Sequence, residues 1–195
     1  MTYDELYADL KNHPVVVDAG KCEGHPSFSG QSSSGKFAFY FMLDEDWLQL
    51  YNYEDNSTHK IAGLKDSFLG LMIGYNSARL GLRCNFENNQ FKYRCFVPVN
   101  YIHKRTSVTY QHLQGAPFIY PGQIYLGKVY QMNGFVRVSL AKVTSNAFKG
   151  ISIGTEFFMD TPMTINSPKT SGVWVEDKWG ESPCEVTTYL KIVNL

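Results

Sequence analysis

The sequence predicts a mainly β protein, an antiparallel β-sandwich or barrel-like domain with one short N-terminal helix. Apolar runs of strand length alternate with turn residues every 8–12 positions, which is typical of sandwiches and barrels. No ten-residue helical pattern separates these runs, so a parallel α/β sheet is disfavoured. The 195 residues carry no net charge and 15% of them are aromatic, enough apolar side chain for a folded core.

The N-terminus contains the clearest helix signal. Thr2 and Glu5 form a capping-box pattern, in which each side chain satisfies a main-chain N–H of the first turn. We expect the helix to end near Asn12, because Pro14 disfavours helix before it. A short strand is predicted at 15–17. The apolar stripe of this helix is predicted to comprise Leu6, Tyr7 and Leu10.

The chain is predicted to divide into three parts. Residues 1–19 hold the helix and short strand, which can act as an arm. Residues 20–35 are a loop rich in glycine and serine. Residues 36–195 are expected to form a single β-rich domain.

Several strands are predicted within this domain. Residues 36–43 are apolar at consecutive positions, which favours a central strand covered on both faces. Residues 47–53 are predicted as the next strand. A hairpin is predicted from 80–86 and 91–97, and later strands at 151–158 and 186–193.

The clearest hairpin joins 125–131 to 135–142 around Asn133-Gly134, a pair that favours a type I′ turn. This register makes Val129 face Val138. Alternation then predicts which side chains of the second strand point inward (Val136, Val138 and Leu140) and which point outward (Arg137 and Ser139).

No complete catalytic, cofactor or metal motif is present, so we expect no cofactor and no metal. Gly30 to Lys36 matches most of a phosphate-binding loop, but Phe37 stands where Ser or Thr is needed and a strand pattern follows. Cys22 and His25 have the spacing of half a zinc site, without a second close pair.

The candidate binding residues are Trp174, Glu176, Asp177 and Trp179. Aromatic faces beside acidic acceptors suit sugars, because the ring packs on C–H groups and the carboxylate accepts from hydroxyls. Trp174 lies in a strand-like Val-Trp-Val segment and can equally be core. Trp179 stands beside Gly180 in a predicted turn, where we expect its indole to be exposed.

His103-Lys104-Arg105 is the chain's basic triplet. Two interpretations are open: a solvated loop between two strands, or a contact to a phosphate or a sialic acid.

These observations favour a non-enzymatic binding or structural-interaction module that contacts a glycan or protein surface and can form a homo-oligomer. The zero net charge disfavours binding to duplex nucleic acid. The longest apolar run, 37–43, is too short to span a membrane. No secretory signal is visible, which predicts a cytoplasmic or virion-associated protein.

Two alternatives remain. The first is a hydrolase, whose active site would consist of His, Asp and Glu residues that are far apart in the sequence and come together only in the folded chain. More weakly, the chain can be a membrane-active β-sandwich with the N-terminal helix as its inserting arm. The strands and Gly or Asn turns after Pro121 are similar to β-structured domains of phage tails and other virion proteins, which implies a virion role.

Overall fold

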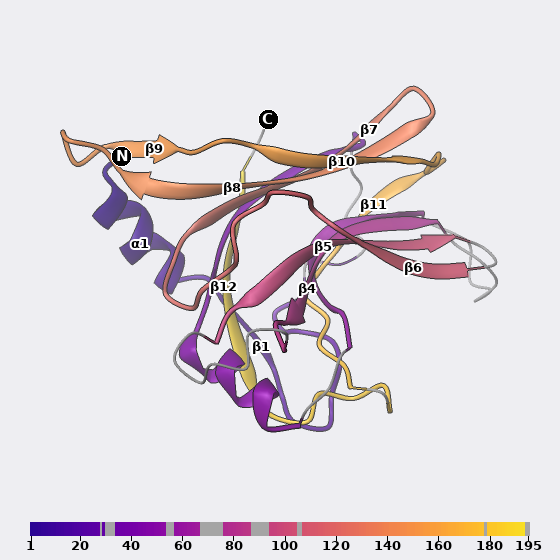
Figure 1. Cartoon of the computed structure of the whole chain (residues 1–195), viewed down its shortest axis with the longest axis horizontal. Coiled ribbons are helices and arrows are strands. Elements are labelled where there is room, and N and C mark those ends of the chain that lie inside the picture. The colour runs from indigo at the N-terminus through magenta and orange to yellow at the C-terminus, as the bar shows by residue number, and fades with distance from the viewer. Residues whose placement is uncertain are drawn as a thin grey trace.

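The protein is a sandwich of two antiparallel sheets, as the sequence predicts, and not a closed barrel (Figure 1). The structure is a computed structural model, and it describes residues 1–27, 29, 34–53, 57–66, 76–86, 94–104, 107–177 and 179–193.

The larger sheet has seven strands, and its first and last strands in the sequence, β1 and β12, are neighbours in it. Its order is β1-β12-β2-β7-β8-β10, and β9 pairs with the far part of β8. The strands are β1 (Pro14–Val17), β2 (Lys36–Leu43), β7 (Tyr125–Met132), β8 (Phe135–Ser145), β9 (Ile151–Ile153), β10 (Phe157–Pro162) and β12 (Val186–Val193).

The smaller sheet has five strands in the order β11-β3-β4-β5-β6. They are β3 (His59–Asp66), β4 (Ser77–Cys84), β5 (Phe96–Lys104), β6 (Ser107–His112) and β11 (Pro168–Ser171). The sequence analysis identified no strand at β3, β6 or β11.

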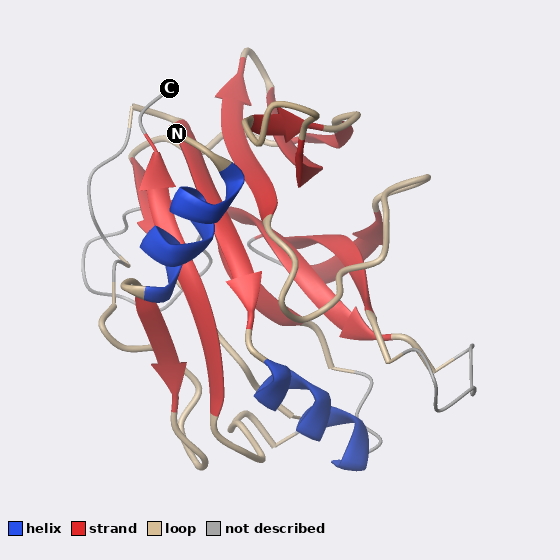
Figure 2. Ribbon diagram, turned by 90° about the vertical axis from the view of Figure 1, so that its left-hand side faces the viewer, coloured by secondary structure: helices blue, strands red, loops and turns tan. Residues whose placement is uncertain are grey.

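β2 is buried on both faces, which confirms the predicted central strand. One face contributes to the main core between the two sheets, and Met42 contributes to a second cluster beneath the N-terminal helix. The helix α1 (Tyr3–Lys11) covers this outer face of the larger sheet (Figure 2). The β2 residues in the main core are Phe37, Phe39, Phe41 and Leu43.

The N-terminal helix begins with the predicted capping box of Thr2 and Glu5, and Asn12 caps its C-terminus. Leu6 and Leu10, one turn apart, are buried in the second cluster, whereas Tyr7 is partly exposed at the margin of the stripe. The apolar surface that an inserting arm would need therefore packs within the fold.

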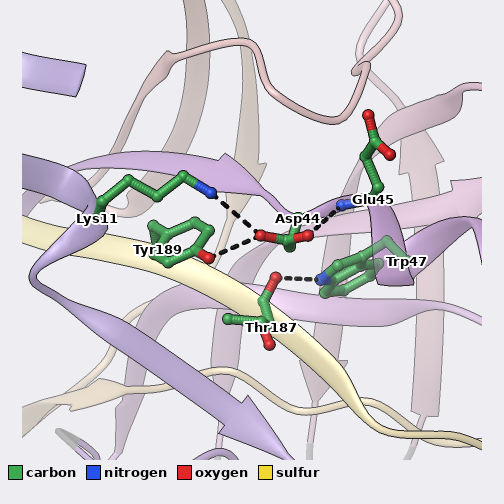
Figure 3. Close-up of polar contacts among 6 residues, drawn as sticks. All are labelled: Lys11, Asp44, Glu45, Trp47, Thr187 and Tyr189. Carbon is green, nitrogen blue, oxygen red and sulfur yellow. Dashed lines mark hydrogen bonds and ion pairs between the residues drawn. The ribbon is translucent and has the colours of Figure 1, made fainter. Parts of the chain in front are cut away.

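Asp44 ties this helix to the larger sheet (Figure 3). Its Oδ2 accepts hydrogen bonds from Lys11 Nζ at 3.1 Å and from the Tyr189 hydroxyl at 2.6 Å. Its Oδ1 accepts from the Glu45 N–H at 2.7 Å. These donors hold the pKa of Asp44 below its usual value, first through Tyr189 and then through Lys11.

The predicted strand at 47–53 is wrong, because this segment lies within a 3₁₀-helix, η1 (Glu45–Tyr53). A 3₁₀-helix repeats every three residues, so Trp47 and Leu50 fall on one side and both are buried. Trp47 packs edge-on against Phe96 and donates its indole N–H to the Thr187 carbonyl oxygen at 3.0 Å (Figure 3). The helix thereby attaches to both sheets.

The hairpin of β7 and β8 has the predicted register, with Val129 opposite Val138. The type I′ assignment is wrong: Gly134 has φ +78°, but Lys149 is the one non-glycine residue with positive φ in the described chain. Ser139 lies on the predicted outer face, but it is buried there between Lys128 and Phe158 of the neighbouring strands.

Two other strand predictions need correction. Residues 151–158 form two strands, β9 and β10, instead of one. In the predicted hairpin at 80–97, the second strand, β5, begins only at Phe96, which pairs with Cys84. Its turn, 87–93, lies outside the described residues. None of the four cysteines, all of which the structure describes, forms a disulfide.

The last strand follows the prediction along most of its length. Val186, Thr188 and Leu190 of β12 are buried on one face, and Ile192 at its end is partly exposed. Within the described part of the chain, no helix is long and apolar enough to cross a membrane.

Candidate functional site

A β-bulge brings charged residues of β3 to the outer face of the smaller sheet. Lys60 pairs with Gly81, but Ala62 pairs with Leu80, so one extra residue is accommodated in β3. Lys60 and Lys65 are five positions apart and would point to opposite faces of a regular strand. The bulge places both on the face away from the core.

The neighbouring strands add polar side chains to the same outer face. Arg79 on β4 lies opposite Gly63 of β3 and Tyr101 of β5. Ser77 lies opposite Lys65 on one side and His103 on the other. Directly paired residues share a face, so β3, β4 and β5 contribute to one polar surface.

Gly63 is required at this place for steric reasons. A Cβ added there would lie 2.3 Å from the Ala78 carbonyl oxygen and 2.6 Å from Arg79 Cα. Only glycine lets β3 approach β4 this closely, and the approach sets where Arg79 emerges from the sheet.

A hollow of about 200 Å³ on this surface is here called the outer-face pocket. Trp174 closes one side, since its main chain forms bridges with both Glu23 and Lys60. The residues that line it are Glu23, Ser29, Lys60, Lys65, Arg79, Tyr101, His103, Ser171, Trp174 and Glu176.

Glu176 organises one wall of the outer-face pocket. Its two carboxylate oxygens accept separately from the Lys60 ammonium and from the Trp174 indole N–H. The Lys60 ammonium also lies over the Tyr101 ring, 4.6 Å from its centroid. Lys60 is only 3% exposed and Arg79 only 7%, so their charges are held within the protein surface.

Three basic groups in the outer-face pocket have lowered pKa values. Burial is the largest cause for Lys60, Lys65 and His103, and the positive charge of Arg79 adds to it in each case. Glu176 opposes the shift at Lys60 by hydrogen bonding to the ammonium. The basic groups therefore repel one another across the pocket.

The structure separates the four predicted binding residues into two places. Trp174 and Glu176 line the outer-face pocket, whereas Asp177 and Trp179 belong to the turn that follows. Asp177 Oδ1 accepts from the Trp179 N–H at 2.6 Å, and Asp177 N–H donates to the Glu181 carbonyl oxygen at 2.8 Å. The Trp179 side chain is 80% exposed, as its predicted turn position requires.

The histidines do not gather at one place. His103 of the basic triplet lines the outer-face pocket, while Arg105 lies outside the described residues. His25 Nε2 lies 3.0 Å from Asp18 Oδ2, and His13 Nε2 lies 3.6 Å from Asp9 Oδ1, both away from the pocket lining. Among the described residues, no group of three His, Cys, Asp or Glu side chains could hold a metal ion.

Sequence reasoning missed Lys60, Lys65 and Arg79. No local spacing connects them, because they come from separate strands or are brought together by the bulge. The available signal was a basic residue inside a run that is otherwise apolar or small, as at Lys60 and Arg79. Such residues are almost never fully buried unless they are paired.

Comparison with known proteins finds no protein-family model that matches the sequence and no curated protein that is significantly similar to it.

Proposed function

We propose that the protein is a non-enzymatic β-sandwich module that binds a glycan through the segment from Trp174 to Trp179. The observation that carries this proposal is the exposed indole of Trp179, held on a hydrogen-bonded turn that directly follows Trp174 and Glu176 of the pocket. A large apolar ring exposed to water often marks a binding site. A side chain that is held in place before binding also loses little conformational entropy when the ligand binds. The turn and the pocket together offer apolar and hydrogen-bonding surface.

Glycan binding fits this combination of groups better than an apolar ligand would. A sugar presents C–H faces to an aromatic ring and hydroxyl groups to carboxylates. Glu23 and Glu176 supply carboxylates within the outer-face pocket, and Trp174 supplies a partly buried ring. A protein surface is the other target, and the test below distinguishes the two.

The test measures binding to a glycan array together with the melting temperature. Trp179→Ala should weaken binding about tenfold or more, because tryptophans that anchor an interface contribute about 2 kcal/mol or more. Its melting temperature should change little. Phe148→Ala is the matched control: Phe148 is 93% exposed on another turn, and its loss should leave binding unchanged.

Two results would count against this proposal. Unchanged glycan binding by a folded Trp179→Ala variant would remove the turn from the site. If no glycan binds but a protein partner does so in a Trp179-dependent way, the module recognises protein and not sugar.

A hydrolase is the second candidate, and the Asp18–His25 pair favours it. A carboxylate that orients a histidine is one part of a nucleophilic site. Hydrolysis of ester or glycoside substrates that disappears in His25→Ala would establish it, whereas equal rates in the wild type and this variant would contradict it.

A further inference from the structure

We infer that the outer-face pocket binds an oxyanion carried by the ligand, and that the module therefore selects acidic sugars over neutral ones. That the ligand is a sugar rests on the proposed function. That it carries an anion is argued from the charges of the pocket itself. The group it would take is a carboxylate, a sulfate ester or a phosphate ester.

The first argument is the balance of charge in the outer-face pocket. Lys60, Lys65 and Arg79 face two carboxylates, Glu23 and Glu176. The Glu176 carboxylate is already engaged by Lys60. The lining thus has one more formal positive charge than negative charge when His103 is neutral, which favours a monoanion.

The second argument concerns Glu23, the remaining carboxylate. It accepts a hydrogen bond from the Ser27 hydroxyl at 2.7 Å. Among the described residues, no acidic side chain lies within 4.0 Å of the Lys65 ammonium, although Glu23 in the same pocket is near enough to oppose the lowering of the Lys65 pKa. Lys65 is therefore the cation best placed to receive a ligand anion.

The third argument is a like-charge pair beside the outer-face pocket. Lys65 of β3 lies directly opposite Lys169 of β11. Like charges in directly paired positions destabilise a sheet, and Lys169 contributes to the lowered pKa of Lys65. A bound oxyanion would offset this repulsion, so binding should be coupled to a gain in stability.

Two features make this a recessed site and not a patch of solvated lysines. Lys60 and Arg79 are nearly buried, where charge interactions are screened less than in water. Both cationic groups lie over the Tyr101 ring, with Lys60 Nζ 4.6 Å and Arg79 Cζ 5.9 Å from its centroid. The sheet thus fixes the cations before any ligand arrives.

The experiment uses four matched ligands: glucose, glucuronic acid, glucose 6-sulfate and glucose 6-phosphate. Affinities are measured by calorimetry with the full chain, and inorganic sulfate serves as the probe for an anion without a sugar. We expect glucuronate and glucose 6-sulfate to bind at least tenfold more tightly than glucose. The monoanions should also exceed the phosphate ester at pH 8, where it carries two charges.

Lys65→Gln is the test variant, and Lys142→Gln is the control, because it makes the same charge change on β8 of the larger sheet, outside the lining of the pocket. Lys65→Gln should lower the affinity for both monoanions at least tenfold, and Lys142→Gln less than threefold. Lys65 is only partly buried, so its replacement should leave the fold intact. Arg79→Gln provides a second variant, with the melting temperature as its check on folding.

The outcomes separate this inference from the proposed function. Equal binding of glucose and the acidic sugars, still dependent on Trp179, would overturn the anion site and leave the glycan module standing. If inorganic sulfate binds as tightly as glucose 6-sulfate, and only with Lys65 present, the anion site is supported and the claim that the ligand is a sugar is overturned. Equal losses in Lys65→Gln and Lys142→Gln would overturn the pocket as the place of binding.

Discussion

Asn146 and Asp177 play the same part in two turns that lie far apart in the sequence. In each turn one side-chain oxygen accepts from the main-chain N–H groups two and four residues further on, at 2.9 and 2.9 Å for Asn146 and at 2.6 and 3.4 Å for Asp177. The residue two positions on is an exposed aromatic in both, Phe148 and Trp179. One turn construction therefore displays two large rings.

The first prediction is that Asp177 holds Trp179 in place. Asp177→Ala removes the acceptor of the Trp179 N–H and should speed exchange of that amide with solvent, with only a small change in melting temperature. Asp177→Asn should keep the protection, because Asn146 performs the same task with an amide oxygen. Hydrogen exchange followed by NMR provides the measurement, and equal exchange rates in all three proteins would disprove the role.

The second prediction concerns Gly63. Gly63→Ala places a Cβ 2.3 Å from the Ala78 carbonyl oxygen, so β3 and β4 must separate. We expect a loss of more than about 2 kcal/mol in the free energy of unfolding, as for overpacking against rigid backbone. Denaturant unfolding measures this change.

Gly134→Ala is the control for Gly63→Ala. A Cβ at Gly134 meets nothing within 4 Å, but its φ of +78° is strained for alanine. It should lose about 1 kcal/mol. A larger loss in Gly134→Ala than in Gly63→Ala would contradict the steric argument.

The third prediction is a pH dependence that arises from Asp44. Its pKa is lowered in the folded protein, so it contributes stability above the unfolded-state pKa of about 4. That contribution is lost as the pH falls through the folded-state pKa. Asp44→Asn should therefore flatten the dependence of unfolding free energy on pH below about pH 4.

Tyr189→Phe refines this test, because the Tyr189 hydroxyl is the largest cause of the lowered Asp44 pKa. This variant should show a pH dependence between those of the wild type and Asp44→Asn. A slope in Asp44→Asn equal to that of the wild type would show that other carboxylates dominate the acid-induced loss of stability.

The sequence predicted elements whose signals are local. The capping box of Thr2 and Glu5 and the hairpin at Gly134 depend on residues a few positions apart, and both were located correctly. β3 was missed because its bulge breaks the alternation on which strand prediction depends. β6 was missed because all six of its residues are exposed and no apolar face marks it.

The candidate site shows the same division. The exposure of Trp179 followed from its neighbours Gly180 and Pro183, which indicate a turn. The cations of the outer-face pocket could not be grouped in advance, because Arg79 and His103 meet Lys65 only through strand pairing. Their spacing along the chain carries no information about that pairing.

The position of β12 has a consequence for how the chain folds as it is synthesised. β12 lies between β1 and β2, so residues 186–193 fill a gap between two strands that emerge from the ribosome far earlier. β1 has no strand partner in the larger sheet until β12 is synthesised, and until then α1 packs against an incomplete sheet. Such distant pairings make folding slow and leave sheet edges exposed in the meantime. The nascent N-terminal half should therefore depend on chaperone protection until the last strand inserts.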